Sequence, residues 1–271
     1  MTVTPVRVAL VGALGRMGLT IARAAAGRDD LRIVAAIERP DHPDLGADLA
    51  ARADAGPAGV IVGADLARGA GAADVVVDLS HPAAAAGVAD AVAAAGVALV
   101  CGTTGLAAAA IEALERAAAK VPVLHTPNLS PGVAVLGELV RRAAAALGPE
   151  YDIEIVELHH RNKADAPSGT ALMLAAEAST GRGRLTPSAM CFGRSGRVGE
   201  RPVGQIGIHA VRGGSIFGEH RVILAGPHER LEIAHLAESR ALFAEGALQA
   251  ALFLARARPG RYTMADVFSA P

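Results

Sequence analysis

The residues best suited to chemistry lie between positions 157 and 171, where the sequence reads E-L-H-H-R-N-K-A-D-A-P-S-G-T-A. This segment brings two adjacent histidines, His159 and His160, together with Lys163. An imidazole changes charge near neutral pH, so it can donate a proton to a reacting group. A lysine ammonium adds a positive charge that attracts a carboxylate or a phosphate. The segment therefore combines a proton donor with an anion site.

The sequence on either side predicts that this segment connects a strand to a helix. Residues 151–158 alternate polar and apolar side chains, as a half-buried strand does, and residues 171–178 are rich in the helix formers alanine, leucine and methionine. Ser168 is a typical N-cap residue, so we expect the N–H groups of Gly169 and Thr170 at the positive end of the helix dipole. A carboxylate or a phosphate is expected to bind there.

His159 and His160 are neighbours on the predicted strand, where adjacent side chains face opposite sides. Both can reach one pocket only if the strand ends or twists at that point. We therefore expect one histidine to do the chemistry and the other to support it. One alternative is a strand pair whose nitrogens are satisfied by backbone groups, and another is a zinc site. No third ligand lies at a useful spacing, so no metal is predicted.

A glycine motif near the start of the chain indicates a dinucleotide site. Residues 6–11 form an apolar strand that runs into G-A-L-G-R-M-G at 12–18, and a helix is expected from about Leu19. Glycines at such a turn let a pyrophosphate approach the backbone. A second predicted strand, 31–37, ends at Glu38, whose carboxylate can accept both ribose hydroxyls of an adenine nucleotide. The alternative is a glycine-rich turn in some other doubly wound protein.

Arg16 and Arg39 leave the choice of cofactor open, because they could bind the 2′-phosphate of NADP while Glu38 suits NAD. Two further loops, 101–105 and 126–129, follow predicted strands and are expected at the same edge of the sheet. The residues predicted to contact NADH or NADPH are Gly12, Ala13, Leu14, Gly15, Arg16, Met17, Glu38, Arg39, Gly102, Thr103, Thr104, Thr126, Pro127, Asn128 and Leu129.

Apolar, strand-like runs alternate with helical stretches up to about residue 130. The runs are residues 6–11, 31–37, 60–62, 74–79, 97–100 and 121–124. This rhythm predicts an α/β domain: a Rossmann-type, doubly wound parallel sheet with helices on both faces.

Past about residue 130 the pattern changes and predicts a second, α+β domain. A helix over 132–147, the strand that carries the histidines and another helix precede short strands near 205–212, 217–225 and 230–236. The Arg-Gly-Gly-Ser run at 212–215 predicts a tight hairpin between the first two of these strands, so we expect a mixed, mostly antiparallel sheet. A last helix is predicted over 240–257.

Composition favours a small-molecule partner. The 271 residues hold 26 Lys plus Arg and 27 Asp plus Glu with no long run of one sign, so neither nucleic acid nor a membrane surface is expected to bind. Cys101 and Cys191 have no metal-ligand spacing, which suits a reducing compartment. The longest apolar stretch, 83–101, carries Asp90 and is read as helix then strand. With no signal peptide evident, a cytoplasmic location is expected.

The motifs at 12–18, 38–39, 101–105 and 159–171 closely resemble those of the bacterial dihydrodipicolinate reductase family, also called 4-hydroxy-tetrahydrodipicolinate reductases. The resemblance continues to the M-x-D-V ending at 264–267. It implies reduction of 4-hydroxy-tetrahydrodipicolinate, through dihydrodipicolinate, to tetrahydrodipicolinate in the diaminopimelate and lysine pathway, with NADH or NADPH. It also implies a dinucleotide domain of residues 1–130 plus 241–271, a substrate domain of residues 131–240, and a homotetramer assembled through the second domain.

The resemblance further implies roles for individual residues. His159 would be the general acid, and Lys163 would bind a substrate carboxylate and also donate a proton. The residues implied to bind the cyclic dicarboxylate are His160, Lys163, Ser168, Gly169 and Thr170.

Two rival functions differ in what they require of the sequence. Another NAD(P)-dependent reductase on the same two-domain plan, such as an amino-acid or semialdehyde dehydrogenase, would need a different segment at 159–171. A dinucleotide sensor without activity would keep the glycines at 12–18 but has no reason to retain an acid beside an anion site.

Overall fold

The computed structural model of the chain describes residues 4–56, 59–183 and 189–268. The chain divides into two compact units, one of residues 1–130 and 240–271 and one of residues 131–239. Each unit has its own sheet and its own apolar core.

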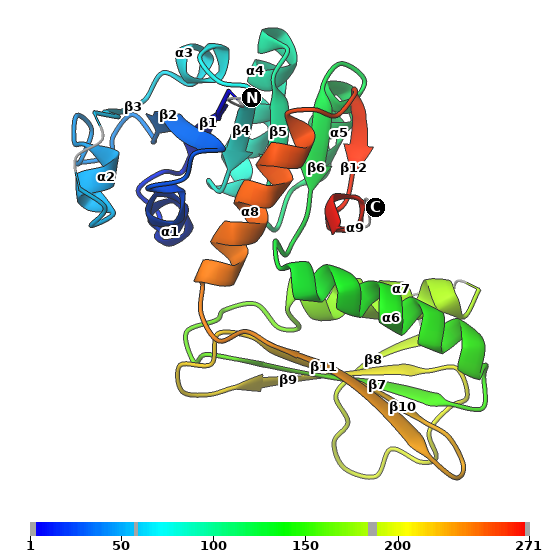
Figure 1. Ribbon diagram of the computed structural model, residues 1–271. Coiled ribbons are helices and arrows are strands. Elements are labelled where there is room, and N and C mark those ends of the chain that lie inside the picture. The colour runs from blue at the N-terminus through cyan, green and yellow to red at the C-terminus, as the bar shows by residue number, and fades with distance from the viewer. Residues whose placement is uncertain (1–3, 57–58, 184–188, 269–271) are drawn as a thin grey trace. The chain divides into compact units, whose positions relative to one another are not determined.

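The first unit is built on a parallel sheet of seven strands among the described residues, in the order β12-β6-β5-β4-β1-β2-β3 (Figure 1). The strands are β1 Val6–Val11, β2 Leu31–Ile37, β3 Val62–Gly63, β4 Val75–Asp78, β5 Ala98–Cys101, β6 Pro122–His125 and β12 Gly260–Tyr262. The order reverses at β1, which lies between β2 and β4, so this is the switch point where such folds bind ligands. The predicted doubly wound sheet is confirmed, although the short strand β12 was not predicted.

Helices pack on both faces of this sheet. On one face α3, α4 and α5 lie side by side, and on the other α1 packs against α8. The helices of the unit are α1 Arg16–Ala25, α2 Leu49–Arg52, α3 Leu66–Gly71, α4 Ala85–Ala95, α5 Ala108–Ala118, α8 Ala241–Leu254 and α9 Met264–Phe268, with a short 3-10 helix, η1, at Pro82–Ala84. Across the described parts of the chain, helices of the length and apolarity needed to cross a bilayer are absent.

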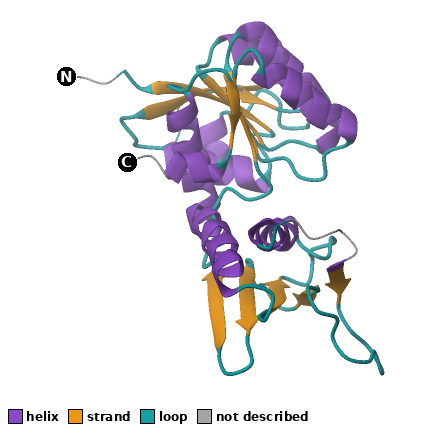
Figure 2. Cartoon of the chain, turned by 90° about the vertical axis from the view of Figure 1, so that its right-hand side faces the viewer, coloured by secondary structure: helices purple, strands orange, loops and turns teal. Residues whose placement is uncertain are grey.

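The second unit has a mixed sheet in the order β11-β10-β7-β9-β8. Its strands are β7 Asp152–His159, β8 Met190–Phe192, β9 Ile206–Arg212, β10 Glu219–Ala225 and β11 Arg230–Leu236. Helices α6 Pro131–Leu147 and α7 Gly169–Gly181 pack together and share a core with β7, β9 and β10. Figure 2 shows helix on one side of the strands of this unit. The sheet is mixed as predicted, but within the described residues parallel and antiparallel neighbours are equally numerous: β10 runs antiparallel to β7 and β11, and β9 runs parallel to β7 and β8.

The prediction of a hairpin at residues 212–215 is wrong. Strands β9 and β10 do not pair with each other, because both pair with β7, which lies between them. The connecting segment instead passes over the end of β7: the N–H of Gly213 donates to the carbonyl of His159 at 2.9 Å, and the N–H of His160 donates to the carbonyl of Ile216 at 2.8 Å. Turn-forming residues specify a local reversal, but strand pairing depends on which neighbour completes the buried face.

Candidate active site

Strand β7 presents its odd-numbered side chains to the core of the second unit. Burial alternates along the strand, and Ile153, Ile155, Glu157 and His159 are all buried. The strand ends at His159, so His160 lies just outside it and is only partly buried. The strand thus ends at the point where the sequence required it to end or twist if both histidines were to reach one pocket.

A fully buried carboxylate, Glu157, lies behind His159. Its Oε2 is 2.5 Å from Nδ1 of His159, and its Oε1 accepts a hydrogen bond of 2.9 Å from the N–H of Ser168. The Arg212 guanidinium donates to both oxygens, from Nη1 to Oε2 and from Nη2 to Oε1, each at 2.8 Å. Burial alone would raise the pKa of Glu157, but these donors outweigh it and hold the pKa at about 2. Glu157 is therefore an ionised acceptor that holds the imidazole at its Nδ1 edge.

The N-terminus of α7 is fastened to the same place. Ser168 is its N-cap, as predicted, because its Oγ accepts from the N–H of Ala171 at 3.1 Å. The same Oγ is 3.1 Å from Nε2 of His220, a buried residue on β10. The His220 and His159 rings meet edge to face with centroids 5.3 Å apart. Burial, and then the nearby charge of His159, lower the pKa of His220 to about 3, so this second ring stays neutral near pH 7.

Lys163 lies in the turn between β7 and α7. Its N–H donates to the carbonyl of His160 at 3.1 Å, and its Nζ is 2.9 Å from Oδ1 of the exposed Asp165. The Lys163 side chain is 22% exposed, so the ammonium remains within reach of solvent. An ion pair with a solvent-exposed partner such as Asp165 is weak, so another carboxylate can replace Asp165. The structure thus places the residues predicted to bind substrate around the end of β7 and the start of α7.

In the first unit the predicted cofactor loops share one edge of the sheet. Val11 is in register with Ile37 on one side and with Asp78 on the other, and Asp78 is in register with Cys101, which pairs with His125. The loops that follow these strand ends therefore lie along a single edge.

The glycine turn has the geometry that a pyrophosphate site requires. Gly12 has φ +76°, and a Cβ there would lie 2.7 Å from the carbonyl oxygen of Leu79. A Cβ at Gly18 would collide with the carbonyl oxygens of Gly12 and Ala13, so α1 packs closely on the turn. Helix α1 begins at Arg16, directly after Gly15, and its first turn holds no acidic residue. Its N-terminus therefore suits an anion, and these residues fit a dinucleotide.

Acidic side chains organise the neighbouring loops. Oε1 of Glu38 accepts from the N–H of Leu14 at 2.9 Å, while Arg39 pairs with Asp41 at 2.5 Å. The fully buried Asp78 accepts from the hydroxyl of Thr103 at 3.2 Å.

The hydroxyls of two residues predicted to contact the cofactor have partners inside the protein. That of Thr103 donates to Asp78, and that of Thr126 donates to the carbonyl of Asn128 at 2.7 Å. Both threonines are buried, whereas Thr104 and Pro127 are exposed at the same loops. The loops would therefore meet a ligand through their exposed residues and their backbone.

Sequence reasoning missed four residues of these sites: Glu157, Arg212, His220 and Asp78. One signal could have found Glu157, because it precedes His159 by two positions and so shares its strand face. Arg212 and His220 come from β9 and β10, and only the pairing of these strands with β7 brings them near it.

Comparison with known protein families shows to which family the chain belongs. The model described as "Dihydrodipicolinate reductase, N-terminus" matches residues 6–129, and the one described as "Dihydrodipicolinate reductase, C-terminus" matches residues 132–268. The chain belongs to the dihydrodipicolinate reductase family. A 4-hydroxy-tetrahydrodipicolinate reductase of Anaeromyxobacter dehalogenans (strain 2CP-C) is 48% identical over 261 residues, which cover 96% of this chain and 97% of the relative. One of Rubrobacter xylanophilus is 46% identical over 264 residues, covering 97% of this chain and 98% of that relative.

Solved structures show the same fold, and one of them is a dihydrodipicolinate reductase. A dipicolinate-bound dihydrodipicolinate reductase from Paenisporosarcina sp. TG-14 superposes with a TM-score of 0.71 at 25% identity, covering 96% of this chain and 97% of that one. An amine dehydrogenase from Mycobacterium smegmatis, at 14% identity and a TM-score of 0.63, covers 96% of this chain and 95% of its own and shares the fold. The family and the reductase activity predicted from the motifs are confirmed.

Proposed function

We propose that this chain reduces 4-hydroxy-tetrahydrodipicolinate, through dihydrodipicolinate, to tetrahydrodipicolinate with NADH or NADPH, as a step of diaminopimelate and lysine biosynthesis. The observation that carries the proposal is the pairing of His159 with the ionised Glu157 at the N-terminus of α7, beside Lys163. This arrangement offers a proton and two places for carboxylates. In this proposal the first unit binds the dinucleotide and the second unit binds the substrate.

His159 is the general acid of the proposed reaction. When bound, the reduced nicotinamide supplies the hydride. The reduced ring must then gain a proton, and His159 gives it from Nε2 because Nδ1 is held by Glu157. The ionised Glu157 stabilises the charged imidazole before the transfer.

Lys163 and the start of α7 hold the two substrate carboxylates. The Lys163 ammonium exchanges Asp165 for one carboxylate, and the N–H groups of Gly169 and Thr170, at the positive end of α7, receive the other. Ser168 contributes by capping the helix, and His160 contacts the ring. Lys163 is also a second proton source.

The glycine turn, Glu38 and Arg39 hold the dinucleotide. The turn and the N-terminus of α1 receive the pyrophosphate, and Glu38 receives the adenine ribose. Arg39 and Arg16 counter the charge of Glu38 when the ribose carries a 2′-phosphate. Both cofactors are therefore substrates of the proposed reaction.

A homotetramer formed through the second unit is supported by apolar residues on the sheet face opposite the helices. Leu236 of β11, Leu158 of β7 and Val211 of β9 belong to one register row, to which β10 contributes Glu219. Val211 is 43% and Leu236 59% exposed. Such a row favours burial against other subunits. Light scattering after gel filtration tests this: Leu236→Lys should reduce the mass from four subunits, and a monomeric parent protein would contradict it. The free cysteines are in keeping with a cytoplasmic location.

The decisive assay follows NADH and NADPH oxidation with the product of dihydrodipicolinate synthase, compared with aspartate semialdehyde alone. We expect oxidation only with the synthase product. Oxidation with aspartate semialdehyde alone would favour a semialdehyde dehydrogenase. Cofactor binding without oxidation in either mixture would favour a dinucleotide sensor.

A further inference from the structure

Glu157 is saturated with donors, and only one of them belongs to a group that must change its charge. A carboxylate offers about four acceptor positions, and here they are taken by Nδ1 of His159, the N–H of Ser168 and both terminal nitrogens of Arg212. Ser168 and Arg212 hold the carboxylate in place from α7 and β9. The remaining contact, with Nδ1 of His159, is the one through which Glu157 acts on the imidazole.

Gly218 lies against the far edge of the His159 ring. A Cβ at Gly218 would lie 3.1 Å from Nε2, and Gly218 has φ +149°, which side chains rarely adopt. Glu157 therefore holds Nδ1 on one side, while no side chain of residue 218 covers Nε2 on the other.

The charged and titratable groups that face His159 come from three strands and a turn. Glu157 shares β7, Arg212 extends from β9, His220 packs from β10, and Lys163 lies in the turn that follows. His220 is neutral near pH 7, and Arg212 is already paired with Glu157. Glu157 is thus the anion in direct contact with the imidazole.

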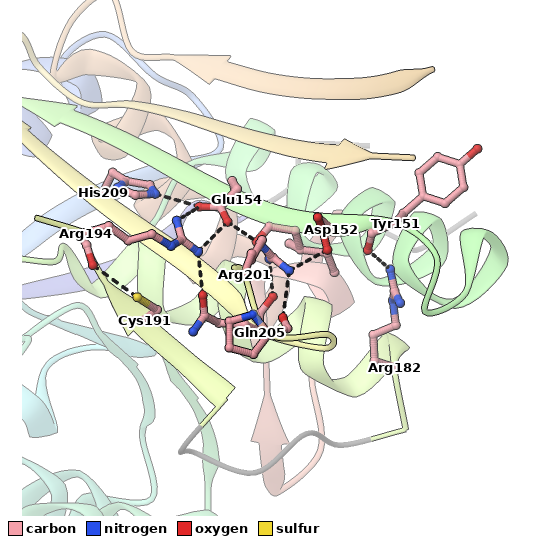
Figure 3. Close-up of polar contacts among 12 residues, drawn as sticks. Tyr151, Asp152, Glu154, Arg182, Cys191, Arg194, Arg201, Gln205 and His209 are labelled. Atoms are coloured by element: carbon pink, nitrogen blue, oxygen red, sulfur yellow. Dashed lines mark hydrogen bonds and ion pairs between the residues drawn. The ribbon is translucent and has the colours of Figure 1, made fainter. Parts of the chain in front are cut away.

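A second glutamate on β7 allows a comparison between a carboxylate that positions His159 and one that only holds the fold together. Glu154, on the opposite face of β7, accepts from Arg194, Arg201 and His209, as Figure 3 shows. It therefore resembles Glu157 in having arginine and histidine partners. Arg194 and Arg201 tie the segment before β9 to the sheet, and His209 lies on β9 itself. None of the three is among the residues proposed to touch the substrate.

We propose that Glu157 is a positioning residue for proton transfer, which fixes His159 as the Nδ1–H tautomer, aims Nε2 at the substrate and stabilises the imidazolium. This inference rests on the proposed function. Arg212 supports it by keeping the carboxylate ionised and in place. An amide at position 157 would keep the shape, but it would lose the charge and could donate to Nδ1, which favours the other tautomer.

The test compares Glu157→Gln with Glu154→Gln in the full-length protein. We expect Glu157→Gln to lower kcat by roughly 10–10²-fold, as the loss of a carboxylate that orients a metal-bound histidine does, and Glu154→Gln to leave kcat within about twofold. Affinities for NADH and pyridine-2,6-dicarboxylate should stay unchanged in both variants. Equal losses of kcat in the two variants would overturn the proposal.

A measurement on the unmodified protein covers the case in which Glu157→Gln fails to fold. Nitrogen-15 NMR of labelled histidine, with His159→Gln used to assign the signal, should show neutral His159 protonated at Nδ1. A neutral ring protonated at Nε2 would overturn the proposal. If instead the parent protein oxidised neither cofactor with any substrate, the proposed function would fail, and the tautomer would still report separately on the Glu157 contact.

Discussion

Oε1 of Glu38, at the end of β2, accepts a hydrogen bond of 2.9 Å from the backbone N–H of Leu14, in the middle of the glycine turn. One acidic side chain thus holds the turn and places a negative charge where the adenine ribose is proposed to bind. Arg39, the next residue, is 60% exposed at its side chain and pairs with Asp41. Discrimination between the two cofactors is therefore expected to depend on Arg39.

Replacing Arg39 with alanine should weaken NADPH binding selectively, by about tenfold or about 1.4 kcal/mol, because a charge-assisted contact to the 2′-phosphate is lost. NADH binding should change little. Fluorescence titration with each cofactor measures the effect. Asp41→Asn is the matched control, since it frees Arg39 and should strengthen NADPH binding. Equal losses for both cofactors in Arg39→Ala would remove the discriminating role.

Replacing His159 with glutamine should lower kcat by roughly 10²–10⁴-fold, the usual contribution of a positioned general acid, and leave NADH binding nearly unchanged. Steady-state kinetics and a cofactor titration measure the two quantities. The exposed His228→Gln serves as a control without an expected effect. A His159→Gln protein that turns over normally would show that the proton comes from elsewhere, with Lys163 the next candidate.

Replacing Lys163 with alanine should raise KM and also lower kcat, because a misplaced ring spoils the geometry of hydride transfer. Calorimetry with NADH present should show pyridine-2,6-dicarboxylate binding at least about tenfold more weakly, a loss of about 1.4 kcal/mol. Asp165→Asn should have the opposite effect, since it removes the internal partner of Lys163. Unchanged dicarboxylate affinity in Lys163→Ala would place the anion site elsewhere.

His220 should make the stability of the protein depend on pH. Its pKa is lowered to about 3 in the folded state, and the ordinary value of about 6.5 applies to the unfolded chain. Between these two pKa values the unfolded chain binds this proton and the folded protein does not. The free energy of unfolding therefore falls as the pH drops below about 6.5, and at pH 5 it is lower by about 2 kcal/mol.

Urea unfolding at pH 8 and pH 5 tests this dependence in the parent protein and in His220→Gln. The variant should lose less stability between the two pH values, while the exposed His228→Gln should behave like the parent. The other titratable groups that face His220 are present in the parent and in both variants: Glu157, His159, His235 and Lys163. An equal loss in parent and His220→Gln would show that His220 is not the responsible group.

Two parts of the protein could be predicted from the sequence because each is local. The glycine turn lies between β1 and α1, and the cap at Ser168 lies between β7 and α7, so neighbours along the chain specify both. The parallel sheet of the first unit also follows from a repeated local pattern of strands and helices. From these features the sequence predicts a proton donor, an anion site and a dinucleotide turn.

The tertiary structure decided how His159, the proposed acid, is held. Arg212 reaches Glu157 across 55 positions and His220 reaches Ser168 across 52, because β9 and β10 both pair with β7. The Arg-Gly-Gly-Ser run at 212–215 signals a turn equally well in either arrangement, so the local sequence could not exclude a hairpin. Only the shared burial of β7, β9 and β10 against α6 and α7 selects the observed pairing. Glu157 and His159 already share one face of β7, two positions apart. Strand order, which many distant contacts set together, places Arg212 beside this buried carboxylate.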